Sequence, residues 1–192
     1  MSFRSRLTIL ALVLLTASSC GGGRRNPTTA RASTLTDSVL GTLTYPAPSL
    51  AASRVTLSGG DWEGDSVGTG RERAHLVFNA RGDLATGGLP AAVVVLFSDP
   101  GATGTFFDII PVRAMNGAAH PGRATALGDR VRPESLWVSN QRAHLILLAH
   151  DSTDGLCCPS RRELRHYRLL GDSLALEGSE LLARLPPGPG GT

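Results

Sequence analysis

The chain has 192 residues, 41% of them hydrophobic, and a formal net charge of +3. All of its basic residues are arginine, and two of them, Arg4 and Arg6, precede an apolar run at the N-terminus. Without that segment, 17 basic residues face 16 acidic ones, so the rest of the chain is nearly neutral. No basic tract is interleaved with aromatic residues, and we therefore expect no nucleic-acid partner.

Residues 1–19 have the layout of a secretory signal peptide: arginines, an apolar run over 7–15, and small residues at 17–19. A bilayer span takes roughly 20 apolar residues, so the run is too short to be a lasting transmembrane helix. Cys20 follows directly and precedes three glycines.

This arrangement around Cys20 resembles the lipobox of bacterial lipoproteins. The resemblance implies cleavage before Cys20 and a lipid on its thiol, so that the protein is extracytoplasmic and anchored to a bacterial membrane, either in the periplasm or on the outer surface. The alternative is an ordinary secretory signal cut within 17–19, which leaves Cys20 as a free thiol.

The chain after the signal divides into three parts. Residues 20–33 contain no large apolar side chain and read as a flexible tether. Residues 34–184 carry the patterns of a single β-rich domain, and the Pro- and Gly-rich residues 185–192 are expected to be a disordered tail. Thr34 and Asp37 have the spacing of a helix cap and predict a short helix that ends before Tyr45.

Strand patterns follow this helix. Val55 and Leu57 alternate with polar residues, and a Gly-Gly-Asp turn leads to Trp62. A second strand is expected around 76–78. Residues 91–97, AAVVVLF, form a continuous apolar run that predicts a strand buried on both faces.

The second half of the chain predicts further strands at 105–114 and 164–170, and hairpin partners at 136–138, 143–149 and 174–176. Residues 179–184 fit either a short strand or a helix. The sequence therefore predicts a mainly β (or α+β) domain: an antiparallel sheet or roll of about seven strands with one short N-terminal helix.

Four segments in the middle of the chain resemble a group of uncharacterised bacterial exported proteins and lipoproteins. They are Gly82-Asp83-Leu84 before the apolar strand, 101–106, the LGDRV turn at 127–131, and Cys157-Cys158-Pro159. The resemblance implies a fold and a compartment but no activity. The first segment is a degenerate form of the FG-GAP-like GDLNGDG calcium loop; because it keeps only Asp83 of the carboxylates, we expect no calcium site.

Cys157 and Cys158 are the thiols that remain if Cys20 is lipidated. Adjacent Cα atoms lie about 3.8 Å apart, below the usual disulfide range of about 4.4–6.8 Å. We expect a strained vicinal disulfide in an oxidising compartment. Two reduced thiols, or a bridge to another molecule, are the alternatives.

The residues beside the cysteine pair are candidates for a ligand or partner loop: His150, Asp151, Asp154 and Arg161. A zinc site joining both cysteines to His150 and His166 is disfavoured, because structural zinc sites separate their thiolates by two to four residues. We expect no metal and no cofactor. Arg161, Arg162, Arg165 and Arg168 predict a charged, solvated sheet edge with Arg162 and Arg168 on one face.

Catalytic patterns are missing from the sequence, which has no G-x-S-x-G nucleophile elbow and no C-x-x-C pair. His75 and His144 occupy positions expected to face solvent. The sequence therefore favours a non-catalytic envelope module that binds a protein, a glycan or a small ligand. The alternative is a thiol- or redox-dependent protein or enzyme that uses Cys157 and Cys158.

Overall fold

The computed structural model describes residues 35–67, 70–86, 88, 90–102, 104–152, 154–155 and 158–186. This part of the chain is mainly β, and all of its strand pairs are antiparallel. Its elements are α2 (Asp37–Leu40), β1 (Thr44–Pro46), β2 (Arg54–Thr56), β3 (Asp61–Val67), β4 (Gly70–Asp83), β5 (Pro90–Asp99), β6 (Phe106–Met115), β7 (Ala118–Pro121), β8 (Thr125–Asp129), β9 (Arg132–Ser139), β10 (Arg142–Ala149), β11 (Arg161–Leu170) and β12 (Ser173–Arg184).

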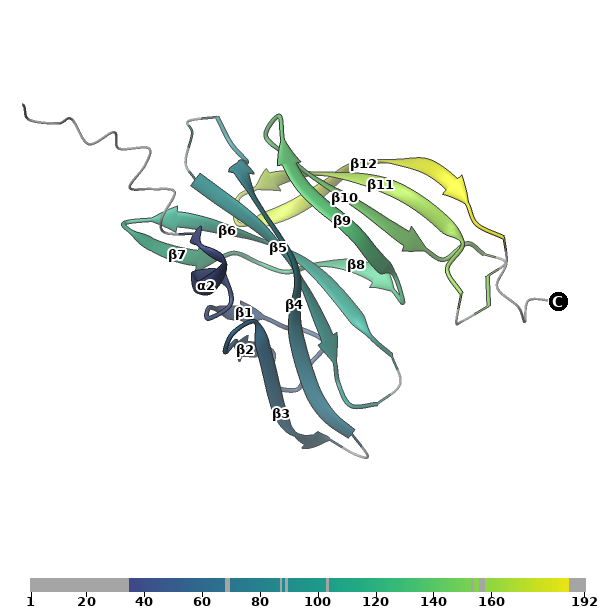
Figure 1. Ribbon diagram of the computed structural model, residues 1–192, viewed down its shortest axis with the longest axis horizontal. Helices are drawn as coiled ribbons and strands as arrows, with labels where there is room; N and C mark the ends of the chain where they lie inside the picture. Colours follow the sequence, from purple (N-terminus) through teal and green to yellow (C-terminus); the bar gives the residue numbers. More distant parts are fainter. Residues whose placement is uncertain are drawn as a thin grey trace, which may run out of the picture.

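The strands form two sheets and a hairpin. The large sheet has the order β3-β4-β5-β6-β7, and β8 also pairs with β6. The small sheet has the order β12-β11-β10-β9, and β1 pairs with β2 in a separate hairpin. Figure 1 shows the small sheet on one side of the large sheet and the β1–β2 hairpin with α2 on the other.

Strand β5 lies at the centre of this arrangement, as its apolar sequence predicts. Ala92, Val94 and Leu96 pack toward the β1–β2 hairpin, whereas Ala91, Val93 and Val95 pack toward the small sheet. All six side chains are at most 4% exposed. Fully burying one valine or leucine contributes about 1.5–3 kcal/mol, so both covering layers are strongly favoured.

The layer around the β1–β2 hairpin is held by polar as well as apolar contacts. The Tyr45 hydroxyl is buried and donates a hydrogen bond of 2.8 Å to the Leu40 carbonyl at the end of α2. Helix α2 is capped by Thr36, whose hydroxyl accepts a hydrogen bond from the Val39 amide, and not by the pair that begins at Thr34. An N-cap hydroxyl accepts from the backbone amide two or three residues later. Thr36 directly precedes the helix, so its hydroxyl reaches the amide of Val39. Thr34 lies outside the described residues.

The described residues contain more strands than the seven expected from the sequence. Those that the sequence did not predict as separate strands include β7 and β8, which have four and five residues. Alternation over so few positions gives little signal, and both strands form because β6 presents a free edge. The expected hairpins around 140–141 and 171–172 are present. Residues 179–184 belong to β12 and are not helical.

The small sheet covers only part of the large sheet. Contact between them is close where Gly82 of β4 meets β9, because a Cβ atom at Gly82 would lie 2.6 Å from Cγ1 of Val138. The distal end of β3 and β4 extends away from the small sheet (Figure 1). That end of the sheet is therefore left open to solvent.

A buried acid interrupts the apolar interior of the large sheet. Asp108 of β6 lies between Leu96 and Ala126 in the strand register and is 3% exposed. Burial raises the pKa of this carboxyl from its ordinary 3.8 to about 6. The folded protein therefore holds this proton more tightly than the unfolded chain does.

We predict that the stability contributed by this buried carboxyl is lost as the pH rises from about 4 to about 6, with no further change from this group above that window. The loss corresponds to about 3 kcal/mol in the free energy of unfolding. Asp108→Asn should remove this pH dependence and make the protein more stable than the parent at pH 7, as measured by urea unfolding. The exposed Asp65→Asn is the control. Equal pH profiles for the parent and Asp108→Asn would contradict this account.

Candidate functional site

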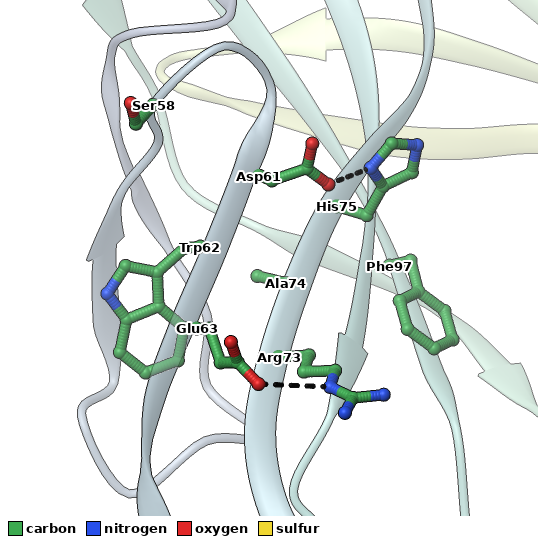
Figure 2. Close-up of a pocket in the computed structure, with 8 residues that line it drawn as sticks. All are labelled: Ser58, Asp61, Trp62, Glu63, Arg73, Ala74, His75 and Phe97. Atoms are coloured by element: carbon green, nitrogen blue, oxygen red, sulfur yellow. Dashed lines mark hydrogen bonds and ion pairs between the residues drawn. The ribbon is translucent and has the colours of Figure 1, made fainter.

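The open end of the large sheet carries a hollow of about 550 Å³ along β3 and β4. Side chains from three strands and the preceding turn surround it (Figure 2). They are Ser58, Asp61, Trp62, Glu63, Arg73, Ala74, His75 and Phe97.

The antiparallel register of β3 and β4 places the charged residues of this hollow in pairs. Asp61 lies opposite His75, and Glu63 lies opposite Arg73. Directly paired residues project to the same face of a sheet, so each carboxylate meets a basic group. His75 is in turn opposite Phe97, whose ring packs against Phe107 at a centroid distance of 5.4 Å.

Both ion pairs are solvated. Asp61 Oδ1 lies 2.5 Å from His75 Nδ1, and Glu63 Oε1 lies 3.6 Å from Arg73 Nε. The Asp61 and His75 side chains are 70% and 54% exposed. Exposed pairs of this kind contribute about 0–1 kcal/mol to stability. Their groups are therefore available to exchange partners with a ligand at little cost to the fold.

Trp62 lies at the same edge, where its indole packs partly against the core around the β1–β2 hairpin and is partly exposed. It projects from β3 on the face opposite to the ion pairs, as Figure 2 shows. Its indole extends along the strand over Gly64, where a Cβ atom would lie 2.3 Å from Cη2 of the ring. The indole can occupy this position only because residue 64 is a glycine and has no side chain.

An Asp–His pair invites comparison with a catalytic triad, which requires a nucleophile within reach of the other imidazole nitrogen. Figure 2 shows Asp61 pointing at the His75 imidazole and Ser58 on the far side of Asp61 from that ring. No described hydroxyl or thiol hydrogen-bonds to Nε2 of His75. The geometry is that of a solvated ion pair, and His75 faces solvent as the sequence predicts.

The site that the sequence singled out lies elsewhere, around the loop after β10. Cys20 and Cys157 are outside the described residues. Cys158 is disulfide-bonded. Its pairing with Cys157, and the lipid on Cys20, stay predictions. Within this loop, His150 Nε2 is buried and has no hydrogen-bond partner among the described residues.

The two acidic residues of this loop organise its backbone. The Asp154 carboxylate accepts hydrogen bonds from the Asp151 amide at 2.7 Å and from the amide and hydroxyl of Ser160 at 2.8 and 2.6 Å. The Ser160 hydroxyl bond, with smaller contributions from the Ser160 amide, His150 and Arg161, holds the pKa of Asp154 below its ordinary value. Asp151 is ion-paired with Arg184 of β12.

Arg161 points into a buried charge cluster of the small sheet. Its Nε lies 3.0 Å from Glu163, which is 4% exposed, and Arg165 approaches the same carboxylate at 2.6 Å. The arginines do alternate between faces, since Arg162 pairs instead with Glu134. The expected solvated edge is wrong, because β11 lies between β10 and β12 and not at an edge.

The described residues contain no group of three or more His, Cys, Asp or Glu side chains placed to hold a metal ion. Within the same residues, no helix has the length and hydrophobicity needed to cross a membrane.

The hollow along β3 and β4 was not identified from the sequence. Two sequence patterns could have indicated it: Asp61-Trp62-Glu63 on one strand and Arg73-Ala74-His75 on the next. The register that pairs them contains a β-bulge between Glu63 and Ser66, which alternation does not reveal.

No family model matches the chain, and no curated protein and no solved structure matches it either. The site is therefore interpreted from its own geometry.

The substitution Asp154→Ala tests whether the Asp154 carboxylate holds the backbone of the loop after β10 in place. The amides of Asp151 and Ser160 lose their acceptor in this variant, so their hydrogen exchange should accelerate while the β5 amides keep their protection. Asp172→Ala, which removes an exposed ion pair with Arg123, is the matched control. Unchanged exchange at Ser160 would show that the carboxylate does not hold the loop.

Proposed function

We propose that the protein is a non-catalytic binding module of the bacterial envelope, anchored through Cys20, and that the hollow along β3 and β4 binds a glycan. The observation that carries the proposal is the composition of this hollow. It combines aromatic side chains with solvated pairs of opposite charge, and among the described residues no hydroxyl or thiol is paired with its imidazole.

The polar groups of the hollow favour a hydroxyl-rich ligand of low charge. Asp61 and Glu63 supply acceptors, while Arg73 and His75 supply donors, and each is already close to an opposite partner. A strongly anionic or cationic polymer would meet repulsion from one member of each pair. Sugar hydroxyls can bond to both members, because they donate and accept.

The aromatic side chains of the hollow suit the apolar C–H faces of a sugar ring. Phe97 presents ring surface beside the polar pairs, and Trp62 presents its indole on the other face of the edge strand β3. The C–H faces of a pyranose ring pack on such surfaces, and aromatic anchors carry a large share of the binding energy in many interfaces. The open shape of the hollow suits an extended chain.

Co-sedimentation with insoluble peptidoglycan tests this proposal, and the two tryptophans of the chain provide a matched pair of variants. Trp62→Ala should raise the dissociation constant about tenfold, which corresponds to about 1.4 kcal/mol. Trp137→Ala, which removes a partly exposed tryptophan from the small sheet, should leave it unchanged. Gly64→Ala is a second test, because its Cβ displaces the indole without removing it.

Circular dichroism and thermal melting establish that each variant is folded. Failure of the parent protein to bind peptidoglycan would overturn the glycan proposal. Equal binding by Trp62→Ala, Gly64→Ala and Trp137→Ala would place the binding surface outside this hollow.

A further inference from the structure

The outer face of the small sheet, turned away from the large sheet, carries a row of three ring side chains. His144 of β10 lies opposite Trp137 of β9 on one side and opposite His166 of β11 on the other. Its neighbours Ala143 and Leu145 are fully buried in the core between the sheets, so alternation directs His144 to the opposite face.

The two imidazoles of this row approach each other through equivalent nitrogens. Nδ1 of His144 lies 2.8 Å from Nδ1 of His166, and the ring planes are nearly perpendicular at 85°. Trp137 stacks on His144 with an interplanar angle of 11° and a centroid distance of 5.1 Å. The stacking fixes the plane of the His144 ring.

Hydrogen bonds to Ser139 determine which nitrogen of His144 carries the proton. Nε2 of His144 lies 3.2 Å from the Ser139 carbonyl oxygen and 3.0 Å from its hydroxyl. A carbonyl oxygen can only accept, so Nε2 bears the hydrogen. In the neutral ring the lone pair is therefore on Nδ1, and Nδ1–H of His166 donates to it.

We propose that His144 and His166 form a binding site for a late first-row divalent metal ion, Cu²⁺ or Zn²⁺, with both Nδ1 atoms as ligands. Imidazole nitrogens suit these ions. Histidine ligands characteristically donate their second N–H to a carbonyl, as His144 does to Ser139. The hydrogen bond to the second ring nitrogen is thus present without the metal.

Binding requires the two rings to separate and to tilt, because in the present hydrogen bond the two Nδ1 atoms point at each other and not at a common metal position. Metal–nitrogen bonds of about 2.0–2.1 Å at a tetrahedral angle separate the two nitrogens by about 3.3 Å. The present separation is 2.8 Å, so the rings need to part by about half an ångström. The proton on Nδ1 of His166 moves to Nε2 of the same ring through solvent, and no net charge is lost from the protein.

The surroundings leave room for further ligands. Gly178 lies opposite His166 on β12, and a Cβ atom at Gly178 would meet no atom within 4 Å. Water molecules can therefore complete the coordination. Of the nearby charges, Glu177 bonds to both Arg142 and Arg168 and offsets one of these two positive charges.

Fluorescence of Trp137 reports directly on this site, because a paramagnetic ion bound by His144 would lie close to the stacked indole. The experiment uses purified protein without a histidine tag in a Trp62→Phe background, which leaves Trp137 as the sole tryptophan. Titration with Cu²⁺ should quench the emission and saturate at one equivalent. Zn²⁺, which does not quench, should displace Cu²⁺ and restore the emission only in large excess, because imidazole ligands bind Cu²⁺ more tightly.

The histidine variants make the assignment specific. His166→Gln and His144→Gln should each weaken Cu²⁺ binding by about tenfold or more. His75→Gln, an exposed histidine of the large sheet, should leave it unchanged. His166→Gln keeps the bond between His144 and Ser139, so it tests the site even if His144→Gln unfolds. Absence of saturable quenching, unaltered affinity in His166→Gln, or equal loss in His75→Gln would each overturn the proposal.

Discussion

The architecture depends on the burial of β5 from both sides. Valines at successive positions point alternately to opposite faces of a strand, so neither face of β5 can be exposed to water without a large loss of hydrophobic stabilisation. Val93 and Val95 require the small sheet, and Val94 requires the β1–β2 hairpin with α2. The three layers of Figure 1 follow from this requirement.

Both proposed binding sites lie on surfaces that this packing leaves exposed to solvent. The small sheet does not reach the distal end of β3 and β4, which leaves Asp61, His75 and Phe97 facing solvent beside the hollow. The row of Trp137, His144 and His166 lies on the outer face of the small sheet. Both surfaces consist of cross-strand rows, so strand register positions their side chains.

The fold class followed from local patterns, whereas the sites did not. The apolar run at 91–97 and the turns at 140–141 and 171–172 are read within a few residues, and each was confirmed. The sites join residues from different strands through a register that bulges can shift. From the sequence, His166 entered only a disfavoured zinc site with the cysteine pair, whereas the β10–β11 register brings it to His144. Likewise, Arg161 turns to the buried Glu163 because β11 is an inner strand.

Native-state hydrogen exchange, resolved by residue, tests most directly whether β5 organises the fold. If it does, the amides of Val93, Val94 and Val95 exchange only through global unfolding, with a protection free energy equal to that from urea unfolding. The amides of the edge strand β3 should exchange through smaller openings that leave β5 protected. Exchange of the three valine amides as rapid as that of β3 would contradict the account, because it would show that β5 opens without disrupting the layers on its two faces.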